Sequence, residues 1–295
     1  MLVVSSCGGG ASSPNPTPRP GPSSQFAHVF VLVEENQQFS DILGNPILPY
    51  LNGLATNNGL ATNYFANAHN SLLDYFMLTT GQTIATDDTY SGTVTDNNVV
   101  RALTAAGKTW RVYAESLPST GYTGGTVFPY AKDHNPFAYF SDVLNNSSQA
   151  SNIVDLNRLT ADIGSGQFAD YSFIIPNQNN NTHDCPVGFT SCSNTDKLGA
   201  MDLWLQNTLT PLLASPVFQQ NSVLIITFDE SVVNDLANGG GKVATILVGP
   251  QVKAGYQSTT FYQHQSTLRL MMEGLGVEDL PGAAASAPQM SEFFK

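Results

Sequence analysis

The chain has 295 residues, enough for one large α/β domain or two small ones. Hydrophobic residues make up 41% of the chain, which supports a globular core and excludes wholesale disorder. Charged residues make up only 12%, and the net charge of −12 argues against nucleic acid or an anionic membrane as a partner.

The first 24 residues are predicted to be a signal remnant followed by a flexible tether. The run LVVSSC resembles the end of a bacterial lipoprotein signal, in which a small residue precedes a cysteine that becomes lipidated, here Cys7. The basic region and longer apolar core of a full signal are missing, so an ordinary disordered N-terminus is the alternative. We expect an exported protein that is periplasmic, on the cell surface or extracellular, with lipidation at Cys7 as its anchor. Residues 25–295 are predicted to form one domain.

Five short apolar runs are predicted to be strands. Their hydrophobicity is continuous rather than alternating, which is typical of strands that are covered on both faces in a parallel sheet. In chain order the runs are HVFVLVEE (28–35), TWRVYAES (109–116), YSFIIPNQ (171–178), SVLIITFDE (222–230) and VATILVGP (243–250).

Helical patterns lie between these runs, and the alternation predicts an α/β fold with a mostly parallel central sheet flanked by helices. One helix is expected to follow Ser71, which would be its N-cap. Asp155 is suited to cap a second helix. The other expected helices and this one cover residues 98–108, 155–163, 197–215 and 266–276. Residues 117–150 show no clear periodicity and are predicted to be a long loop or a cap over one edge.

Polar side chains follow three of the predicted strands, and the carboxyl ends of parallel strands meet at the rim where open α/β sheets bind ligands. Carboxylates with an amide suit a hard divalent cation, and histidines would extend the choice to zinc, iron or manganese. For each acid the alternative is a solvated turn, and for each histidine a structural or surface role. The residues are Glu34, Glu35 and Asn36, then Asn177, His183 and Asp184, then Asp229 and Glu230, with His264 further along.

Ser71 combines two features of a nucleophile for phosphorus. It lies two residues after His69 and just before a helical pattern, where the helix end would hold phosphoryl oxygens and a cation would lower the pKa of the hydroxyl. Capping alone is the alternative role for Ser71. His264 also precedes a helix start. With only 11 Lys and Arg in the chain, an anionic substrate would need metal ions and helix ends for neutralisation.

Two of the three cysteines lie in one Pro- and Gly-containing loop. Cys185 and Cys192 are seven residues apart and could close as a disulfide, and the lack of any CxxC pair argues against a zinc cluster.

Six segments, in order from about Ala27 to Gly276, resemble the bacterial phosphoesterase family that includes acid phosphatases and phospholipases C, a branch of the alkaline-phosphatase-like superfamily. The segments are VFVLVEENQQFSDILG, HNSLLDYFMLTTG, PNQNNNTHDC, LIITFDES, VATILVGPQVKAG and YQHQSTLRLMMEGLGV. There are two departures from the family pattern: Leu73 and Asp74 stand where Pro-Asn is common, and Asn181 stands where Asp is usual.

The resemblance implies an alkaline-phosphatase-like fold and hydrolysis of a phosphate ester through a phosphoserine at Ser71. It implies a divalent cation (Zn, Fe, Mn, Mg or Ca) held by Glu35, Asn36, Asp229 and Glu230. His264 or His183 would assist the leaving group, and His69 and Asp184 would contact the substrate, a small phosphate ester or a phospholipid.

Three alternatives stay open. The nearest is a phosphodiesterase or phospholipase C. A sulfatase or phosphonate hydrolase is a second, although the Cys/Ser-x-Pro-x-Arg segment of sulfatases is missing. The third is a non-catalytic surface lipoprotein, for which the departures at Asp74 and Asn181 would be signs of drift.

Overall fold

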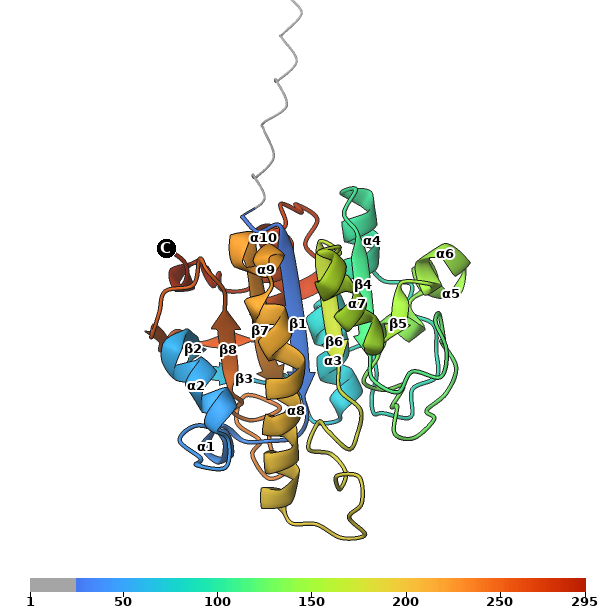
Figure 1. Ribbon diagram of the computed structural model, residues 1–295. Coiled ribbons are helices and arrows are strands. Elements are labelled where there is room, and N and C mark those ends of the chain that lie inside the picture. The colour runs from blue at the N-terminus through green and yellow to red at the C-terminus, as the bar shows by residue number, and fades with distance from the viewer. Residues whose placement is uncertain (1–24) are drawn as a thin grey trace, which may run out of the picture.

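An eight-stranded sheet in the order β5-β4-β6-β1-β7-β8-β2-β9 forms the centre of the computed structural model, which describes residues 25–295 (Figure 1). Cys7 lies outside the described residues. The strands of this sheet are β1 (His28–Glu34), β2 (Gly59–Ala61), β4 (Trp110–Ala114), β5 (Ile153–Asp155), β6 (Tyr171–Ile175), β7 (Ser222–Phe228), β8 (Thr245–Val248) and β9 (Gln257–Ser258). A second, two-stranded sheet pairs β3 (Tyr64–Phe65) with β10 (Tyr262–Gln263).

The sheet is mostly parallel, as predicted, but one strand runs the other way. Strands β5, β4, β6, β1 and β7 pair in parallel, whereas β8 is antiparallel to both β7 and β2. The expectation that the apolar run at 243–250 joins a parallel sheet was therefore wrong. Parallel neighbours need a long crossover that usually contains a helix, and no helix lies between β7 and β8.

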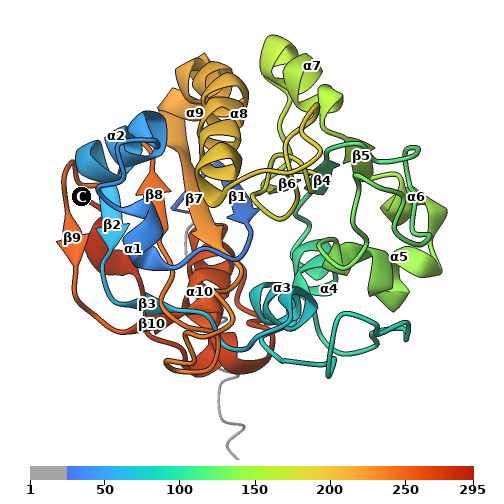
Figure 2. The ribbon, with the colours of Figure 1, turned by 90° about the horizontal axis from the view of Figure 1, so that it is seen from below.

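Helices cover both faces of the sheet (Figure 2). Helices α3, α4 and α10 lie on one face, and α2, α7, α8 and α9 lie on the other. The helices are α1 (Phe39–Ile42), α2 (Pro49–Asn57), α3 (Ser71–Thr80), α4 (Val99–Ala105), α5 (Ser141–Leu144), α6 (Ser147–Ala150), α7 (Asn157–Ser165), α8 (Asn194–Ala214), α9 (Pro216–Asn221) and α10 (His264–Gly274), with 3₁₀ turns at Pro136–Tyr139, Gly282–Ser286 and Ser291–Phe293.

Several predicted helix starts differ from the structure; α10, for example, begins at His264 rather than at residue 266. Asp155 ends β5 and its side chain accepts a hydrogen bond from the backbone of Asn157, where α7 begins. Helix α8 begins three residues before the predicted start, because Ser193 and Asp196 form a reciprocal capping box. The segment 117–150 is not one long loop: it holds a 3₁₀ turn and two four-residue helices, each too short to show helical periodicity.

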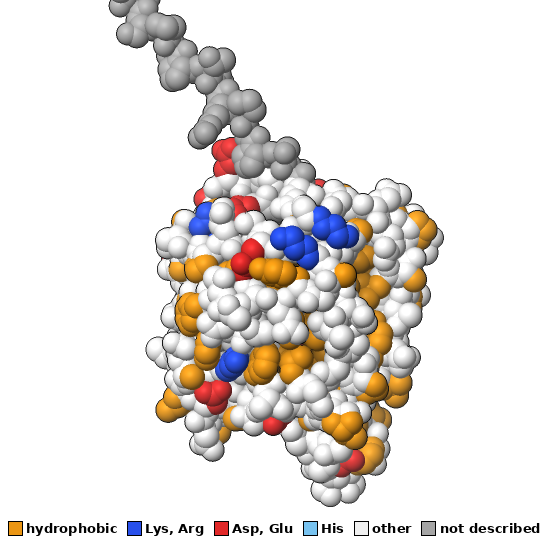
Figure 3. All heavy atoms as spheres, turned by 90° about the vertical axis from the view of Figure 1, so that its left-hand side faces the viewer, with side chains coloured by type: hydrophobic (Ala, Val, Ile, Leu, Met, Phe, Trp, Pro, Cys, Tyr) orange, Lys and Arg blue, Asp and Glu red, His pale blue; other side chains and the backbone are white. Residues whose placement is uncertain are grey.

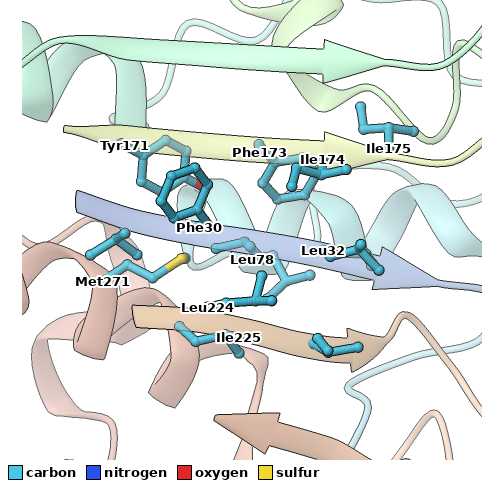
Figure 4. Packing of buried hydrophobic residues seen from close by; sticks show 14 of the residues in the cluster. Phe30, Leu32, Leu78, Tyr171, Phe173, Ile174, Ile175, Leu224, Ile225 and Met271 are labelled. Atoms are coloured by element: carbon cyan, nitrogen blue, oxygen red, sulfur yellow. The ribbon is translucent and has the colours of Figure 1, made fainter. Parts of the chain in front are cut away.

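The core lies on both sides of the three central strands. Every residue of β7 and all but the first of β1 are buried, as expected for strands covered on both faces. In Figure 4, Phe30 and Leu32 of β1, Leu224 of β7 and Phe173 of β6 pack with side chains from the flanking helices. The rigid central strands can therefore hold the polar groups at their carboxyl ends in fixed positions.

Uncharged side chains dominate the surface on the face that carries β2, β8 and α2 (Figure 3). Only scattered charged groups are visible there, in keeping with the low proportion of charged residues in the chain. Among residues 25–295, no helix has the length and apolar character needed to cross a membrane.

Candidate active site

The carboxyl ends of β1, β6 and β7 meet at one rim of the sheet, as predicted. The backbone N–H of Asp229 donates to the carbonyl of Glu34, and the N–H of Glu35 donates to the carbonyl of Asn181. Asn36 follows with a φ of 50°, a left-handed conformation that asparagine tolerates better than most residues. The turn at Asn36 brings its backbone N–H to within 3.0 Å of Oδ1 of Asp229.

Ser71 lies at this rim, but it does not cap the helix as predicted. Asn70, with a φ of 82°, occupies the N-cap position, and Ser71 is the first residue of α3. The Ser71 hydroxyl donates instead to Oε2 of Glu35, at 3.1 Å, and its side chain is buried. The hydroxyl is thus committed to the acidic rim rather than to the backbone of its own helix.

Two aromatic side chains hold the other oxygen of Glu35. The Tyr75 hydroxyl donates to Oε1 at 2.6 Å, and Nδ1 of His134 lies 3.4 Å from the same atom. The two rings stack with centroids 5.5 Å apart, and both are buried. His134 carries no local signal of this role in the sequence, because it lies in the aperiodic segment 117–150, where nothing shows which strand end it will meet.

Burial makes this rim strongly unfavourable for negative charge. It raises the pKa of Glu35 to about 8, and burial together with repulsion from Glu35 raises the pKa of Asp229 well above its usual value. Burial likewise raises the pKa values of Glu34 and Asp74. In the part of the chain that the structure describes, the ion pairs of Glu35, Asp74 and Glu230 involve only histidines, never Lys or Arg.

The oxygen atoms at the rim fit a hard cation. Oδ2 of Asp229 and Oδ1 of Asn36 are buried and receive no hydrogen bond from a hydroxyl or N–H group, although such buried atoms are normally satisfied; Asp229 and Glu35 can share a hydrogen bond only when one of the two carboxyls is protonated. With Glu35 and the Ser71 hydroxyl they form an all-oxygen set of the type that Mg²⁺, Ca²⁺ or Mn²⁺ accepts. The set has only two carboxylates: no three His, Cys, Asp or Glu within 25–295 group together as ligands.

Glu230, which the resemblance implies as a ligand, contacts His69 instead. One carboxylate oxygen of Glu230 hydrogen-bonds to Nδ1 of His69, and Nε2 of His69 hydrogen-bonds to the carbonyl of Asp235. Burial raises the pKa of Glu230 to about 7, against the opposing effect of His69. This pair connects the loop after β7 to the loop before α3, so it fixes the approach to Ser71.

The two histidines predicted to assist the leaving group have very different surroundings. His264 is fully buried, with Nδ1 3.0 Å from the Tyr64 hydroxyl and Nε2 2.6 Å from the carbonyl oxygen of Asp229, and burial lowers its pKa to about 4. Through its contact with the Asp229 carbonyl, His264 stabilises the segment that directly follows β7. His183 is 39% exposed, 3.5 Å from Asp184, and its ring lies 6.1 Å from that of His134, at the open side of the site.

Asp74, a departure from the family pattern, has a structural explanation. Its Oδ1 accepts the backbone N–H groups of Asn67 and Ala68, so it fixes the loop that leads to Ser71. An asparagine oxygen could accept the same two bonds. The expected disulfide is confirmed: Cys185 and Cys192 are joined, with their Cα atoms 5.6 Å apart.

One sizeable hollow lies away from this rim. It has a volume of about 520 Å³ and is lined by Lys108, Thr109 and Trp110, among others, at the amino ends of β4 and β6. None of the acids at the carboxyl-end rim lines it.

Solved structures share this fold. A protein of the alkaline phosphatase superfamily from Vibrio parahaemolyticus superposes with a TM-score of 0.63 at 12% identity, covering 93% of this chain and 74% of that one. A phosphonate monoester hydrolase from Agrobacterium radiobacter gives 0.58 at 12% identity, covering 91% and 77%. The predicted alkaline-phosphatase-like fold is confirmed.

Curated relatives show higher identity. A probable acid phosphatase from Kluyveromyces lactis is 29% identical over 255 residues, which are 82% of this chain but only 56% of the relative. A phosphatidylinositol-3-phosphatase from Mycobacterium tuberculosis is 29% identical over 273 residues, covering 91% of this chain and 83% of that protein. The profile of the Phosphoesterase family matches residues 45–278. The chain belongs to the phosphoesterase family.

Proposed function

We propose that the chain hydrolyses phosphate monoesters through a phosphoserine at Ser71. The observation that supports this most directly is the hydrogen bond from the Ser71 hydroxyl to the buried carboxyl of Glu35, beside Asp229. A buried serine that only capped its helix would donate or accept within the first turn, whereas the Ser71 hydroxyl donates to Glu35. The acid phosphatases among the relatives favour a monoester, and a phosphodiesterase or phospholipase C is the second candidate.

The residues proposed to hold a divalent cation are Glu35, Asn36, Asp229 and the Ser71 hydroxyl. When bound, such a cation would lower the pKa of the hydroxyl and neutralise phosphoryl oxygens. The unpartnered oxygens of Asp229 and Asn36 support the proposal.

The reaction proceeds in two steps on this chain's side chains. Oγ of Ser71 forms a bond to phosphorus as the bond from phosphorus to the ester oxygen breaks, and the Ser71 proton leaves to solvent water, because the cation would occupy the Glu35 carboxylate. The N-terminal end of α3 is oriented to favour the phosphoryl oxygens. His183, at the open side, is the group available to protonate the leaving alcohol. In the second step water bonds to phosphorus and gives a proton to His183, the bond from phosphorus to Oγ breaks, and Ser71 regains a proton from solvent as phosphate leaves.

The relatives also suggest a substrate class. One is a phosphatidylinositol-3-phosphatase, which keeps a phospholipid among the candidate substrates. Export and lipidation at Cys7 stay predictions, and the absence of a nucleic-acid partner is expected from the charge of −12.

The test measures turnover of para-nitrophenyl phosphate and its bis-ester by the full chain, after chelation and after addition of Mg²⁺, Ca²⁺, Mn²⁺ or Zn²⁺. Ser71→Ala is expected to remove nearly all turnover. Ser172 is also buried, but its hydroxyl has no hydrogen-bond partner, so Ser172→Ala is expected to retain turnover. Retained turnover in Ser71→Ala rejects the nucleophile. No turnover of either ester by the wild type, from acid to alkaline pH, favours a non-catalytic binding protein.

A further inference from the structure

A second hollow, of about 490 Å³, lies next to the candidate active site. It is formed by the disulfide loop after β6 and by Phe128 from the segment before the 3₁₀ turn; its lining residues are Phe128, Asn179, Asp184, Cys185, Pro186, Val187, Gly188, Phe189 and Thr190. The N–H of Gln178 donates to the carbonyl of Pro129, which joins the two walls.

A series of neighbouring side chains leads from Ser71 to this hollow. Glu35, which accepts the Ser71 hydrogen bond, lies 3.4 Å from His134, and the rings of His134 and His183 are 6.1 Å apart. His183 lies 3.5 Å from Asp184, which lines the hollow. The Thr182 hydroxyl donates to the carbonyl of Glu35. The hollow therefore borders the candidate site on the side of His183, where the organic group of a phosphate ester held at Ser71 could enter it.

The walls of the hollow expose large apolar side chains. Val187 is 83% exposed, Phe128 is 62% exposed and Phe189 is 52% exposed. Of the ten large hydrophobic side chains exposed within 25–295, these three line a single hollow. Exposed apolar side chains that occur singly need no explanation, but a group beside a reactive centre marks a binding surface.

The loop that presents these side chains is held in place. The disulfide closes it between Cys185 and Cys192, and Nδ2 of Asn179 donates to the carbonyl of Cys185 at 2.6 Å. The N–H of Asp184 donates to the carbonyl of Gln178 at 2.8 Å. Because the loop is fixed at its base, a ligand would meet the apolar walls with little ordering cost.

We propose that this hollow binds the organic group of the substrate, and that the substrate is a phosphate monoester of an apolar alcohol or phenol. The proposal rests on the proposed function and names its substrate class. The lining residues include no Lys or Arg, and Asp184 is their single charged member. Lys197 donates to the carbonyl of the neighbouring His183 at 2.6 Å but does not line the hollow, so a second phosphate or carboxylate on the substrate would meet a carboxylate in the lining and no cation among the lining residues. An apolar group, by contrast, would remove the three side chains from water.

The experiment compares 1-naphthyl phosphate with glycerol 1-phosphate, which share the phosphate and differ in the polarity of the organic group. In Val187→Ser/Phe189→Ser we expect kcat/KM for the naphthyl ester to fall about tenfold further than for the glycerol ester. Leu203→Ser, which changes an exposed leucine on α8, and Val233→Ser, which changes an exposed valine in the loop after β7, are the controls. An equal change for both esters in the double variant overturns the proposal.

Two further measurements separate its failure from other outcomes. If the wild type cleaves neither ester, the proposed function fails, and ligand binding to Ser71→Ala then tests the hollow by itself. Tighter binding of naphthyl phosphate than of inorganic phosphate, lost when Val187→Ser/Phe189→Ser is added, supports the apolar binding surface. Equal binding of the two ligands overturns it. Phosphatidylcholine vesicles carrying phosphatidic acid test a lipid surface. If turnover in Val187→Ser/Phe189→Ser falls only with vesicles, and Val233→Ser shows the same fall, the apolar binding surface is overturned in favour of membrane contact by the whole rim.

Discussion

Tyr75 donates its hydroxyl hydrogen to Oε1 of Glu35 over 2.6 Å, while Ser71 donates to Oε2 of the same carboxyl. The two donors come from the first and fifth residues of α3 and therefore lie on one face of the helix. Glu35 thus has a single orientation, set by Tyr75 on one oxygen and open to chemistry on the other.

Tyr75→Phe is expected to weaken divalent-cation binding and to lower kcat by roughly tenfold, because groups that orient a metal ligand are typically worth ~10- to 100-fold. Cation affinity by calorimetry and kcat for para-nitrophenyl phosphate are the measurements. Tyr171→Phe is the matched control, since its buried hydroxyl has no hydrogen-bond partner. Equal cation affinity in Tyr75→Phe and the wild type would contradict the orienting role.

Asp229→Asn is expected to lower the amount of divalent cation that copurifies with the protein or binds after dialysis. The amide keeps the oxygen that accepts the Asn36 N–H, so the fold should survive, but it removes the negative charge next to Glu35. Elemental analysis measures the effect. Asp142→Asn, which changes an acid paired with Arg101 at the surface, is the control. Unchanged metal content in Asp229→Asn would count against the site.

The pKa values predict how the stability of the cation-free protein depends on pH. The pKa of Glu35 rises from 4.5 to about 8 on folding, so the unfolded chain releases a proton that the folded protein keeps, and stability falls as pH rises toward 8. The lowered pKa of His264, about 4 instead of 6.5, has the opposite effect below pH 6.5. Between about pH 6.5 and 8 only the carboxyl effect remains, and it has the same sign for Glu230.

We therefore expect the Tm of chelator-treated protein to fall from pH 6.5 to 8. An added divalent cation should raise Tm more at pH 8 than at pH 6.5, because it takes the place of the proton on Glu35. Glu35→Gln should flatten the fall. A Tm that rises over this interval without metal would refute the assignment.

The parts of the site that the sequence predicts are those with local signals. A buried run that leads directly into Glu35 and Asn36, or into Asp229, predicts a functional site at the end of the strand, because burying a carboxylate is costly unless it is paired or binds a cation. The parallel pairing of β1 with β6 and β7 then brings those ends together. Ser71 was found by its position before an apolar helix.

The parts that the sequence misses depend on packing between distant segments. His134 reaches Glu35 from nearly 100 positions away (134 − 35 = 99), out of a segment without periodicity. Glu230 pairs with His69, and the path of the loop after β7 determines this pairing. The direction of β8 leaves no trace in its hydrophobicity, because a buried strand is equally apolar in either direction.

The disulfide gives a prediction about both stability and the apolar hollow. Replacing both Cys185 and Cys192 by Ser frees the chain between them, and the chain-entropy account assigns a loop of this length roughly 2–3 kcal/mol. For a domain of this size that corresponds to a fall in Tm of about 5 °C. Because the same loop carries Val187 and Phe189, kcat/KM for naphthyl phosphate should fall more than for glycerol phosphate.

Calorimetry with and without a reductant separates the bridge from the substitutions. The reductant should lower the Tm of the wild type to that of Cys185→Ser/Cys192→Ser and leave the variant unchanged, because the variant has no bond between these positions to break. A wild type whose Tm is insensitive to a reductant that demonstrably opens the bridge would show that the bridge contributes nothing to the stability of the folded domain. In that case an unaltered preference for the naphthyl ester would show that Val187 and Phe189 keep their positions without the bridge.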